Sequence, residues 1–206
     1  ISESGWCSRR EVDELINQQR VTLNGEIAVT GAKWLEGMTV LVDGHVVKQK
    51  PTAKNKRKHV YIALHKPVGI TCTTDTADAS NIVDFIDHQE RIFPIGRLDK
   101  DSEGLILLTS NGDIVNRILR AENNHEKEYL VGVNKPVTEE FLRTMARGVH
   151  IHRQLTKPCK VSKLAKYGFR ITLTQGLNRQ IRLMSEALGY KVVQLRRVRI
   201  INVKLG

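Results

Sequence analysis

Three carboxylates cluster in one loop near the middle of the chain. The loop reads Gly96-Arg97-Leu98-Asp99-Lys100-Asp101-Ser102-Glu103-Gly104 and runs into the apolar stretch 105–109. That stretch has the length of a buried strand, and a loop fixed by a strand is a usual place for reactive groups. The spacing does not choose among Asp99, Asp101 and Glu103, and a solvated acidic turn is the alternative. The preceding arginine and the apolar strand favour a reactive carboxylate.

This loop resembles a known catalytic segment. The string GRLDKDSEGLILLT is similar to the active-site loop of RNA pseudouridine synthases, in the group that acts on bacterial ribosomal RNA and carries an S4 domain (the RsuA/RluB/RluF type). The resemblance covers nearly the whole chain. It implies that Asp99 is the catalytic aspartate, with Arg97 and Leu98 beside it as substrate contacts.

A second motif supports the resemblance. Lys127-Glu128-Tyr129 is similar to the K-x-Y motif of the family, which implies that Tyr129 stacks on the target uracil and that Lys127 contacts RNA. Without the resemblance, Tyr129 is better explained as a strand aromatic that faces the core. The turn 66–69 (KPVG) resembles another family motif, which supports the active-site loop and carries no chemistry.

A third motif, QGLNRQIRLM at 175–184, is predicted to begin the last helix, which stops at Gly189. The resemblance implies that Arg182 pairs with the catalytic aspartate, although Leu183 replaces the second arginine that is usual in the family. Arg179 is expected one turn earlier on the same face, where it could bind phosphate instead. Two arginines on a surface helix are common, so their spacing alone is weak support.

The first 47 residues resemble an S4 RNA-binding domain. The string from Ile1 to Gly44 carries this likeness, which implies four phosphate contacts: Arg9, Arg10, Arg20 and Lys33. Ordinary solvated side chains are the alternative, since this segment has 4 basic and 7 acidic residues. Residues 48–58 are basic and lack apolar periodicity, as in a flexible linker. The expected domains are therefore 1–47 (S4), 48–58 (linker) and 59–206 (pseudouridine synthase).

The predicted fold class is α+β. In the larger domain, the resemblance implies a mixed, mostly antiparallel central sheet flanked by helices, but the order of the strands is not predicted. Helices are expected at 9–16 (capped by Ser8), 81–86, 113–119 (with Ile114, Val115, Ile118 and Leu119 buried) and from Thr138, and strands at 21–23, 39–42, 60–64, 105–109, 127–133, 159–164, 169–173 and 192–203.

The charge distribution points to a polyanionic partner. The chain carries a net charge of +11, but residues 150–206 hold 13 basic and 1 acidic side chain, whereas residues 59–149 hold 10 and 14. Such an asymmetry is more consistent with one face that contacts phosphates than with a uniformly soluble surface.

Several other classes of protein are disfavoured. The three cysteines lie far apart without a C-x-x-C pair and the histidines lack ligand spacing, which argues against a zinc site or a disulfide framework and fits a reducing cytoplasm. No apolar run approaches membrane-spanning length. No nucleotide-binding or metalloprotease motif is present. Neither a metal nor a cofactor is therefore expected.

The chemistry that the resemblance implies is a rearrangement of uridine. The N1–C1′ bond breaks, the base turns in place, and C5 joins C1′, with no redox change and no group donor. Asp99 would attack C1′ or remove the C2′ proton, and Arg182 would keep it ionised. Leu98 and the strand 105–108 would exclude water from the pocket. The uridine must be flipped out of the helix to react.

The expected partner is ribosomal RNA, most of all the 23S rRNA, because the strings FPIGRLDKDS, HEKEYLV and QGLNRQIR match the large-subunit members best. 16S rRNA and tRNA are the other RNA substrates considered, and the protein is expected to be a monomer away from membranes. Two other functions are weighed: a non-catalytic ribosome-binding protein with an S4 module, and a glycoside hydrolase using Asp99 with Asp101 or Glu103. The hydrolase is disfavoured because carboxylates so close on one loop would not straddle a sugar.

Overall fold

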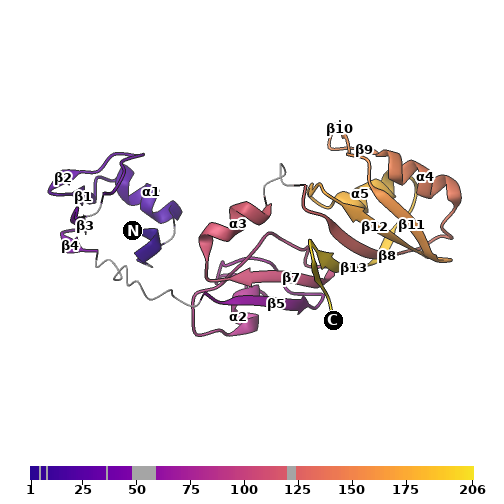
Figure 1. Ribbon diagram of the computed structural model, residues 1–206, viewed down its shortest axis with the longest axis horizontal. Helices are drawn as coiled ribbons and strands as arrows, with labels where there is room; N and C mark the ends of the chain where they lie inside the picture. Colours follow the sequence, from indigo (N-terminus) through magenta and orange to yellow (C-terminus); the bar gives the residue numbers. More distant parts are fainter. Residues whose placement is uncertain (5, 8, 36, 48–58, 120–123) are drawn as a thin grey trace. The chain divides into compact units, whose positions relative to one another are not determined.

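The computed structural model describes residues 1–4, 6–7, 9–35, 37–47, 59–119 and 124–206 (Figure 1). The chain divides into two compact units, Ile1–Arg57 and Lys58–Gly206. The predicted linker 48–58 and the predicted helix cap Ser8 lie outside the described residues. Within the described ranges, no helix has the length and apolar character that crossing a membrane requires.

The smaller unit packs one helix on a short antiparallel sheet. It contains η1 (Ser2–Ser4), α1 (Arg9–Asn17), β1 (Val21–Leu23), β2 (Glu26–Ile27), β3 (Val40–Val42) and β4 (His45–Val46), in the sheet order β2-β1-β3-β4. Asn24-Gly25 and Asp43-Gly44 both have positive φ, as in the tight turns that join hairpin strands. Leu15 and Ile16 of α1 pack against the valines of β1 and β3.

The larger unit is built on an eight-stranded sheet, in which six strands follow the order β11-β12-β8-β13-β7-β5 and the other two, β14 and β6, pair with β13 and β7. Only the pairing of β13 with β7 is parallel among the described strands, so the sheet is mixed and mostly antiparallel, as predicted. The strands are β5 (Tyr61–Lys66), β6 (Phe93–Pro94), β7 (Glu103–Thr109), β8 (Lys127–Val133), β11 (Lys160–Ala165), β12 (Gly168–Leu173), β13 (Val192–Ile200) and β14 (Val203–Lys204).

Four helices and a small hairpin complete this unit. They are α2 (Ile82–Ile86), α3 (Gly112–Leu119), α4 (Glu139–Arg147), α5 (Gln180–Ala187), β9 (His150–Ile151) and β10 (Gln154–Leu155). Asn81 caps α2 by accepting from the Asp84 N–H, and Thr138 caps α4 by accepting from the Phe141 N–H. The predicted helix starts at 81 and 138 are confirmed by these caps.

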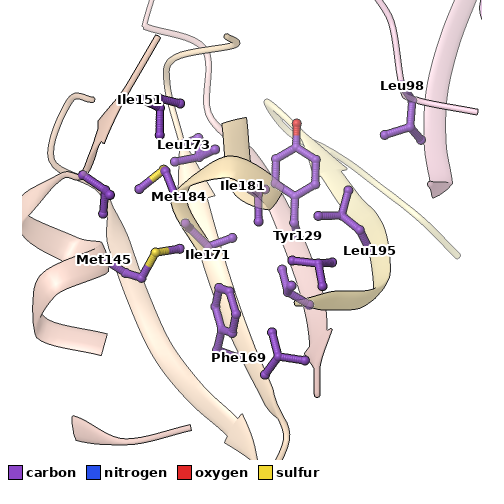
Figure 2. Close-up of a cluster of buried hydrophobic side chains, with 14 of the residues drawn as sticks. Leu98, Tyr129, Met145, Ile151, Phe169, Ile171, Leu173, Ile181, Met184 and Leu195 are labelled. Atoms are coloured by element: carbon purple, nitrogen blue, oxygen red, sulfur yellow. The ribbon is translucent and has the colours of Figure 1, made fainter. Parts of the chain in front are cut away.

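The core lies where alternate side chains of β8 and β12 meet helices α4 and α5 (Figure 2). Phe169, Ile171 and Met184 are completely buried, and Met145 of α4 joins them. Burying each such side chain contributes about 1.5–3 kcal/mol to folding. The period-two pattern of β12 thus fixes one face of the sheet against the helices.

Two predicted boundaries and the predicted burial of one residue differ clearly from the structure. The last helix begins at Gln180, not near 175, because Arg179 adopts a left-handed conformation (φ 50°) that interrupts a helix. The strand predicted to run to 203 ends at Ile200, since Ile201 also has positive φ and turns the chain into β14. Leu119 of α3, predicted to be buried, is 40% exposed.

We predict that Gly104→Ala destabilises the larger unit by about 3 kcal/mol or more. Gly104 has φ 108°, and a Cβ there would overlap the Arg197 backbone on the neighbouring strand. Urea unfolding measures the loss. Gly112→Ala is the matched control, because a Cβ at Gly112 meets only Phe93 at an ordinary 3.9 Å. Equal midpoints for the two variants would contradict this account of the strand contact.

From the Cys159 thiol we predict that the free energy of unfolding depends on pH. Burial raises its pKa from 9.0 to about 11. As the pH rises above 9, the unfolded chain loses the thiol proton before the folded protein does. Ionisation of this thiol therefore leaves the free energy of unfolding unchanged below pH 9 and lowers it by about 1–3 kcal/mol between pH 9 and pH 11. Cys159→Ala should be less sensitive to alkali than the wild type in urea unfolding at pH 8 and 10.5. Parallel losses in both proteins would contradict the prediction.

Candidate active site

The loop that carries Asp99 leads from β6 into β7 and is held by the segment that follows β5. The Gly69 N–H donates to the Lys100 carbonyl at 2.7 Å, and the Leu98 N–H donates to the Cys72 Sγ at 3.4 Å. The Ser102 N–H closes the loop on the Asp99 carbonyl at 3.0 Å. These contacts give the turn 66–69 the supporting role expected from the sequence.

Two buried cations fix the backbone around this loop. Lys66, completely buried, donates from Nζ to the carbonyls of Pro67 and Ile70 at 2.8 and 2.9 Å. Burial lowers its pKa, against the opposing charges of Asp101 and Asp99. Arg197, on β13, donates from Nε to the Leu105 carbonyl at 2.6 Å and from Nη1 to the Arg97 carbonyl at 3.2 Å. Arg197 therefore joins strand β7 to the residue two positions before Asp99.

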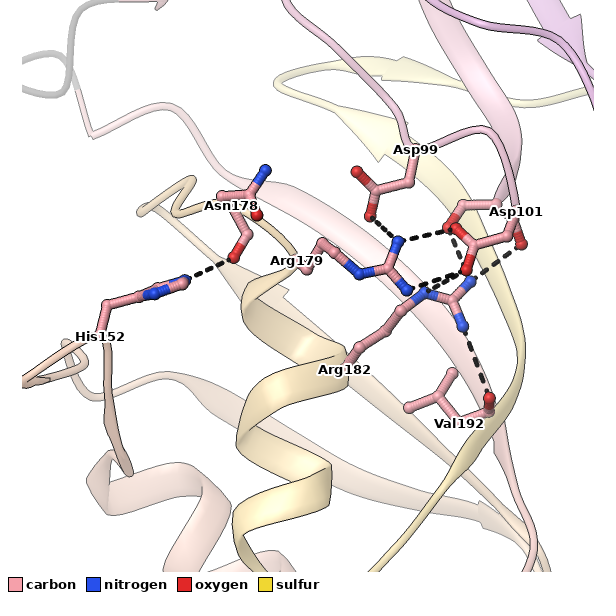
Figure 3. Close-up of polar contacts among 8 residues, drawn as sticks. Asp99, Asp101, His152, Asn178, Arg179, Arg182 and Val192 are labelled. Atoms are coloured by element: carbon pink, nitrogen blue, oxygen red, sulfur yellow. Dashed lines mark hydrogen bonds and ion pairs between the residues drawn. The ribbon is translucent and has the colours of Figure 1, made fainter.

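Two aspartates and two arginines form one charged cluster (Figure 3). Arg179 donates through both terminal nitrogens to Asp101, at 3.3 and 3.0 Å, and its Nη1 lies 3.9 Å from Asp99 Oδ2. Arg182 contacts Asp101 instead: its Nη2 donates to the Asp101 carbonyl and to Ser102 Oγ, both at 2.9 Å, and its Nε lies 3.4 Å from Asp101 Oδ2. The predicted pairing of Arg182 with Asp99 is thus replaced by Arg179 with Asp99.

Asp101 is the carboxylate that organises this cluster. Burial opposes its ionisation, but the hydrogen bond from Arg179 and the charge of Arg182 outweigh that effect and lower its pKa. Arg179 occupies the position before α5 in a left-handed conformation, which directs the chain so that its side chain reaches the loop. Asp101 therefore holds both arginines beside Asp99.

A pocket of about 470 Å³ opens between the Asp99 loop, β8, β13 and the start of α5. Its wall contains the residues of the larger unit to which the resemblance gives a role in the site, namely Arg97, Leu98, Asp99, Lys127, Tyr129, Arg179 and Arg182, whereas Asp101 and Glu103 do not line it. Among the described residues that line it, five are basic and Asp99 is the single acid. The volume suits a ligand of the size of a nucleoside, in a strongly positive field.

Tyr129 stands in this wall rather than wholly in the core. It is buried, and its phenol oxygen projects beyond the hydrophobic cluster formed with Leu195 and Ile181 (Figure 2). On the neighbouring strand its register partner is Arg197, and Lys127 lies two residues before it. Burial lowers the pKa of Lys127, and the charge of Arg197 lowers it further.

Asp99 keeps 32% of its side-chain surface exposed in the absence of RNA. The sequence predicts that Leu98 and the strand 105–108 form the apolar wall of the pocket. Leu98 lines the pocket, but Leu105, Ile106 and Leu108 are buried and do not line it. The sheet places those three in the core, and the apolar wall is supplied instead by distant strands, at Leu173, Leu195 and Ile200.

Sequence reasoning missed the role of Arg197. It is one of three arginines on the last strand, with Arg196 and Arg199. In the sequence these three count only toward the basic charge of residues 150–206, which is expected to contact phosphates. Leu195 and Arg197 are two residues apart, so the alternation of a strand places both on one face. That alternation was the available signal that Arg197 faces inward, unlike Arg196, which pairs with Glu103.

The basic residues predicted to bind RNA in the smaller unit are not equivalent. Arg20 is engaged within the unit, where its Nε donates to Asp43 Oδ1 at 2.7 Å. Arg10 and Lys33 are exposed, and the side chain of Arg9 is outside what the structure describes. In the described part of the chain, no group of three or more His, Cys, Asp or Glu side chains is arranged to hold a metal ion.

The chain is similar to known proteins in sequence and in structure. The family described as "RNA pseudouridylate synthase" matches residues 60–187. The Dual-specificity RNA pseudouridine synthase RluF of Escherichia coli K12 is 57% identical over all of this chain and 70% of its own length. The Ribosomal large subunit pseudouridine synthase B of Bacillus subtilis is 32% identical over 96% of this chain and 82% of its own length.

A solved structure, the "Crystal structure of pseudouridylate synthase", is 29% identical, covers all of this chain and 87% of its own, and superposes with a TM-score of 0.69. The chain therefore belongs to the RNA pseudouridine synthase family, as its sequence predicted. It is an isomerase that acts on RNA, which makes the glycoside hydrolase and the non-catalytic alternatives wrong.

The two arginines of the cluster should contribute differently to stability. We predict that Arg182→Ala lowers the free energy of unfolding by about 2–3 kcal/mol, because it removes charged hydrogen bonds to the loop backbone and to buried Ser102. Arg179→Ala should cost about 1 kcal/mol or less, because its ion pairs are half exposed. Urea unfolding of both variants tests this, and equal losses would contradict the anchoring role of Arg182.

Proposed function

We propose that Asp99 is the catalytic carboxylate of this RNA pseudouridine synthase. The observation that carries the proposal is that Asp99 is the single acid among the described residues lining a pocket whose other charged residues are basic. A carboxylate there can attack C1′ of the target uridine or remove its C2′ proton. Its backbone neighbours Leu98, Lys100 and Arg97 are held by Cys72, Gly69 and Arg197, which supports a preorganised position.

Tyr129 is proposed to stack on the target uracil. Its ring is buried against Leu195 and Ile181, so it is rigid, while its phenol end reaches the pocket. A planar aromatic held in this way offers a platform to any flipped base. Once the glycosidic bond has broken, such a platform keeps the detached base in place while it turns.

The arginines are proposed to act at different distances from the reaction. Arg179, whose Nη1 lies 3.9 Å from Asp99 Oδ2, is the cation placed to hold this carboxylate in position. Arg182 acts as a positioning residue, because its contacts are with Asp101 and Ser102 rather than Asp99. Arg97 is exposed at the mouth of the pocket, where it is suited to a phosphate beside the flipped nucleotide.

Binding of RNA is proposed to complete the pocket. The target atoms are inaccessible in a stacked helix, so the uridine must be flipped out to meet Asp99. Filling the pocket with a base then removes water from the half-exposed carboxylate and strengthens its interactions. The rearrangement needs neither a redox cofactor nor a group donor, so the chain's own side chains suffice.

The RNA is proposed to be ribosomal, with 23S rRNA as the main substrate, converted at a specific uridine in the cytoplasm by a monomer. The similarity to large-subunit enzymes supports this choice. The unit Ile1–Arg57 is proposed to be an S4 module that docks on the RNA, through exposed residues such as Arg10 and Lys33. A second substrate, tRNA, is proposed because the relatives called RluF carry the description "Dual-specificity".

We predict that Asp99→Asn abolishes conversion of uridine but changes RNA affinity by only a few fold, because the amide keeps the shape and loses the nucleophile and base. Tritium release from 5-tritiated uridine in 23S rRNA and in tRNA measures turnover, and filter binding measures affinity. Asp87→Asn is the matched control, since Asp87 ends α2 away from the pocket with φ 50°, which asparagine tolerates well.

Two results would count against this assignment. Turnover by Asp99→Asn at a rate near that of the wild type would show that another group does the chemistry. A collapse of RNA affinity in step with the rate would make Asp99 a binding residue instead. Tritium release from tRNA but not from 23S rRNA would overturn the choice of main substrate and leave the catalytic assignment intact.

A further inference from the structure

The side chain of Arg197 has one donor group without a partner. It is 4% exposed, and Nε and Nη1 are used in the bonds to Leu105 and Arg97. Nη2 is buried, and no described residue accepts a hydrogen bond from it. A buried donor left unpaired is costly, and its persistence in the wall of a pocket points to an acceptor that arrives with a ligand.

Lys127 adds a second uncompensated charge beside it. Its side chain lines the same pocket, and no ion pair or hydrogen bond joins its Nζ to any residue that the structure describes. Arg179 and Arg196 are compensated by Asp101 and Glu103. The Nε of Arg182 is also buried without a hydrogen-bond acceptor among the described residues, but it lies 3.4 Å from the Asp101 carboxylate. Arg97 is exposed to solvent. Arg197 and Lys127 therefore form a positive corner of the pocket that is not neutralised from within the described chain.

The place of this corner favours a base over a phosphate as its ligand. Arg197 is the register partner of Tyr129 on the adjacent strand, so its donor lies alongside the aromatic platform. A planar guanidinium next to an aromatic ring suits a flat ligand with oxygen acceptors in its plane. Uracil has two such oxygens.

The reaction itself produces an anion at this place. When the N1–C1′ bond breaks, both electrons remain on N1, and the resulting uracil anion shares its charge with the carbonyl oxygens. C1′ either gains a bond to the Asp99 carboxylate or, after loss of the C2′ proton to Asp99, forms a double bond to C2′. C5 then attacks C1′. In the first route the C1′–O bond to Asp99 breaks and frees the carboxylate, and in the second the proton held by Asp99 returns to C2′. The proton on C5 finally passes to a base, and N1 gains a proton. Arg197 stays protonated throughout.

We propose that Arg197, assisted by Lys127, binds a carbonyl oxygen of the target uracil through Nη2 and stabilises the uracil anion that leaves C1′. This inference rests on the proposed function of Asp99. It adds the residue that stabilises the negative charge on the uracil while Asp99 acts on the ribose. A preorganised donor in a site shielded from water is strongest where charge develops, so the effect is on the rate of bond cleavage more than on affinity.

The test compares two leaving groups. Arg197→Lys and Lys127→Met are assayed under single turnover on one RNA that carries either uridine or 5-fluorouridine at the target, with loss of that nucleoside followed by mass spectrometry after digestion. On uridine we expect slowing on the order of 100-fold for Arg197→Lys and about tenfold for Lys127→Met. The defects should be smaller on 5-fluorouridine, because fluorine stabilises the departing anion intrinsically.

Arg197 also bonds to the backbone of the loop, so Arg197→Lys could slow the reaction by disturbing the structure. The Lys127 side chain bonds to no described residue, so a slower reaction in Lys127→Met cannot be explained in this way. Lys135→Met, an exposed lysine that lies over the Tyr190 ring, is the control for loss of one positive charge. Equal slowing on both substrates, or a loss of affinity at unchanged rate, would overturn the inference. A wild type inactive on uridine would instead overturn the proposed function, and this inference with it.

Discussion

The close approach of β13 to β7 is the contact on which the site depends. Gly104 and Arg197 face each other across the parallel pairing of these strands, and the absence of a side chain at Gly104 lets the two backbones meet. That approach brings the Arg197 guanidinium within reach of the Leu105 and Arg97 carbonyls. The Asp99 loop is thereby fastened to a strand distant in sequence, and the pocket acquires its rear wall.

Charge is arranged around this contact in two tiers. The outer tier, in which Asp101 pairs with both Arg179 and Arg182, contains one negative and two positive charges, so its ion pairs shape the loop and leave a net charge of +1. The inner tier, formed by Lys66, Lys127 and Arg197, is buried or half buried and exceeds the charge of Asp99. Buried cations interact over longer distances than exposed ones, because protein screens charge less than water. The inner tier therefore sets the electrostatic character of the pocket.

Much of the larger unit could be predicted from its sequence, because its strands and helices carry clear local signals. Thr138 and Asn81 start helices, β8 begins at Lys127, and the hairpin of β11 and β12 lies where the pattern indicated. The errors fall where tertiary contacts override local pattern. Arg179 adopts a conformation rare for arginine because Asp101 holds its side chain, and this delays α5.

The sequence predicted which residues line the site better than it predicted which of them pair with one another. The motifs brought Asp99, Tyr129 and Arg182 into one pocket, but which arginine reaches which aspartate depends on the path of residues 175–179, and no periodicity encodes that path. Arg197 was missed as a member because three neighbouring arginines look alike as charge. The alternation of β13 distinguishes Arg197 from Arg196, but the bond from Arg197 to Leu105, 92 positions earlier on β7, depends on strand pairing that the local sequence does not show.

The long separation in sequence between Arg197 and the Asp99 loop affects how the enzyme folds during its synthesis. Arg197 bonds to a residue 92 positions earlier, so the loop of Asp99 emerges from the ribosome long before the strand that fastens it. Contacts between such distant segments form late, after local hairpins and helices have collapsed. A nascent chain that has exposed its reactive aspartate is consequently still without the rear wall of its pocket, and catalytic competence arrives in a single late step rather than by degrees.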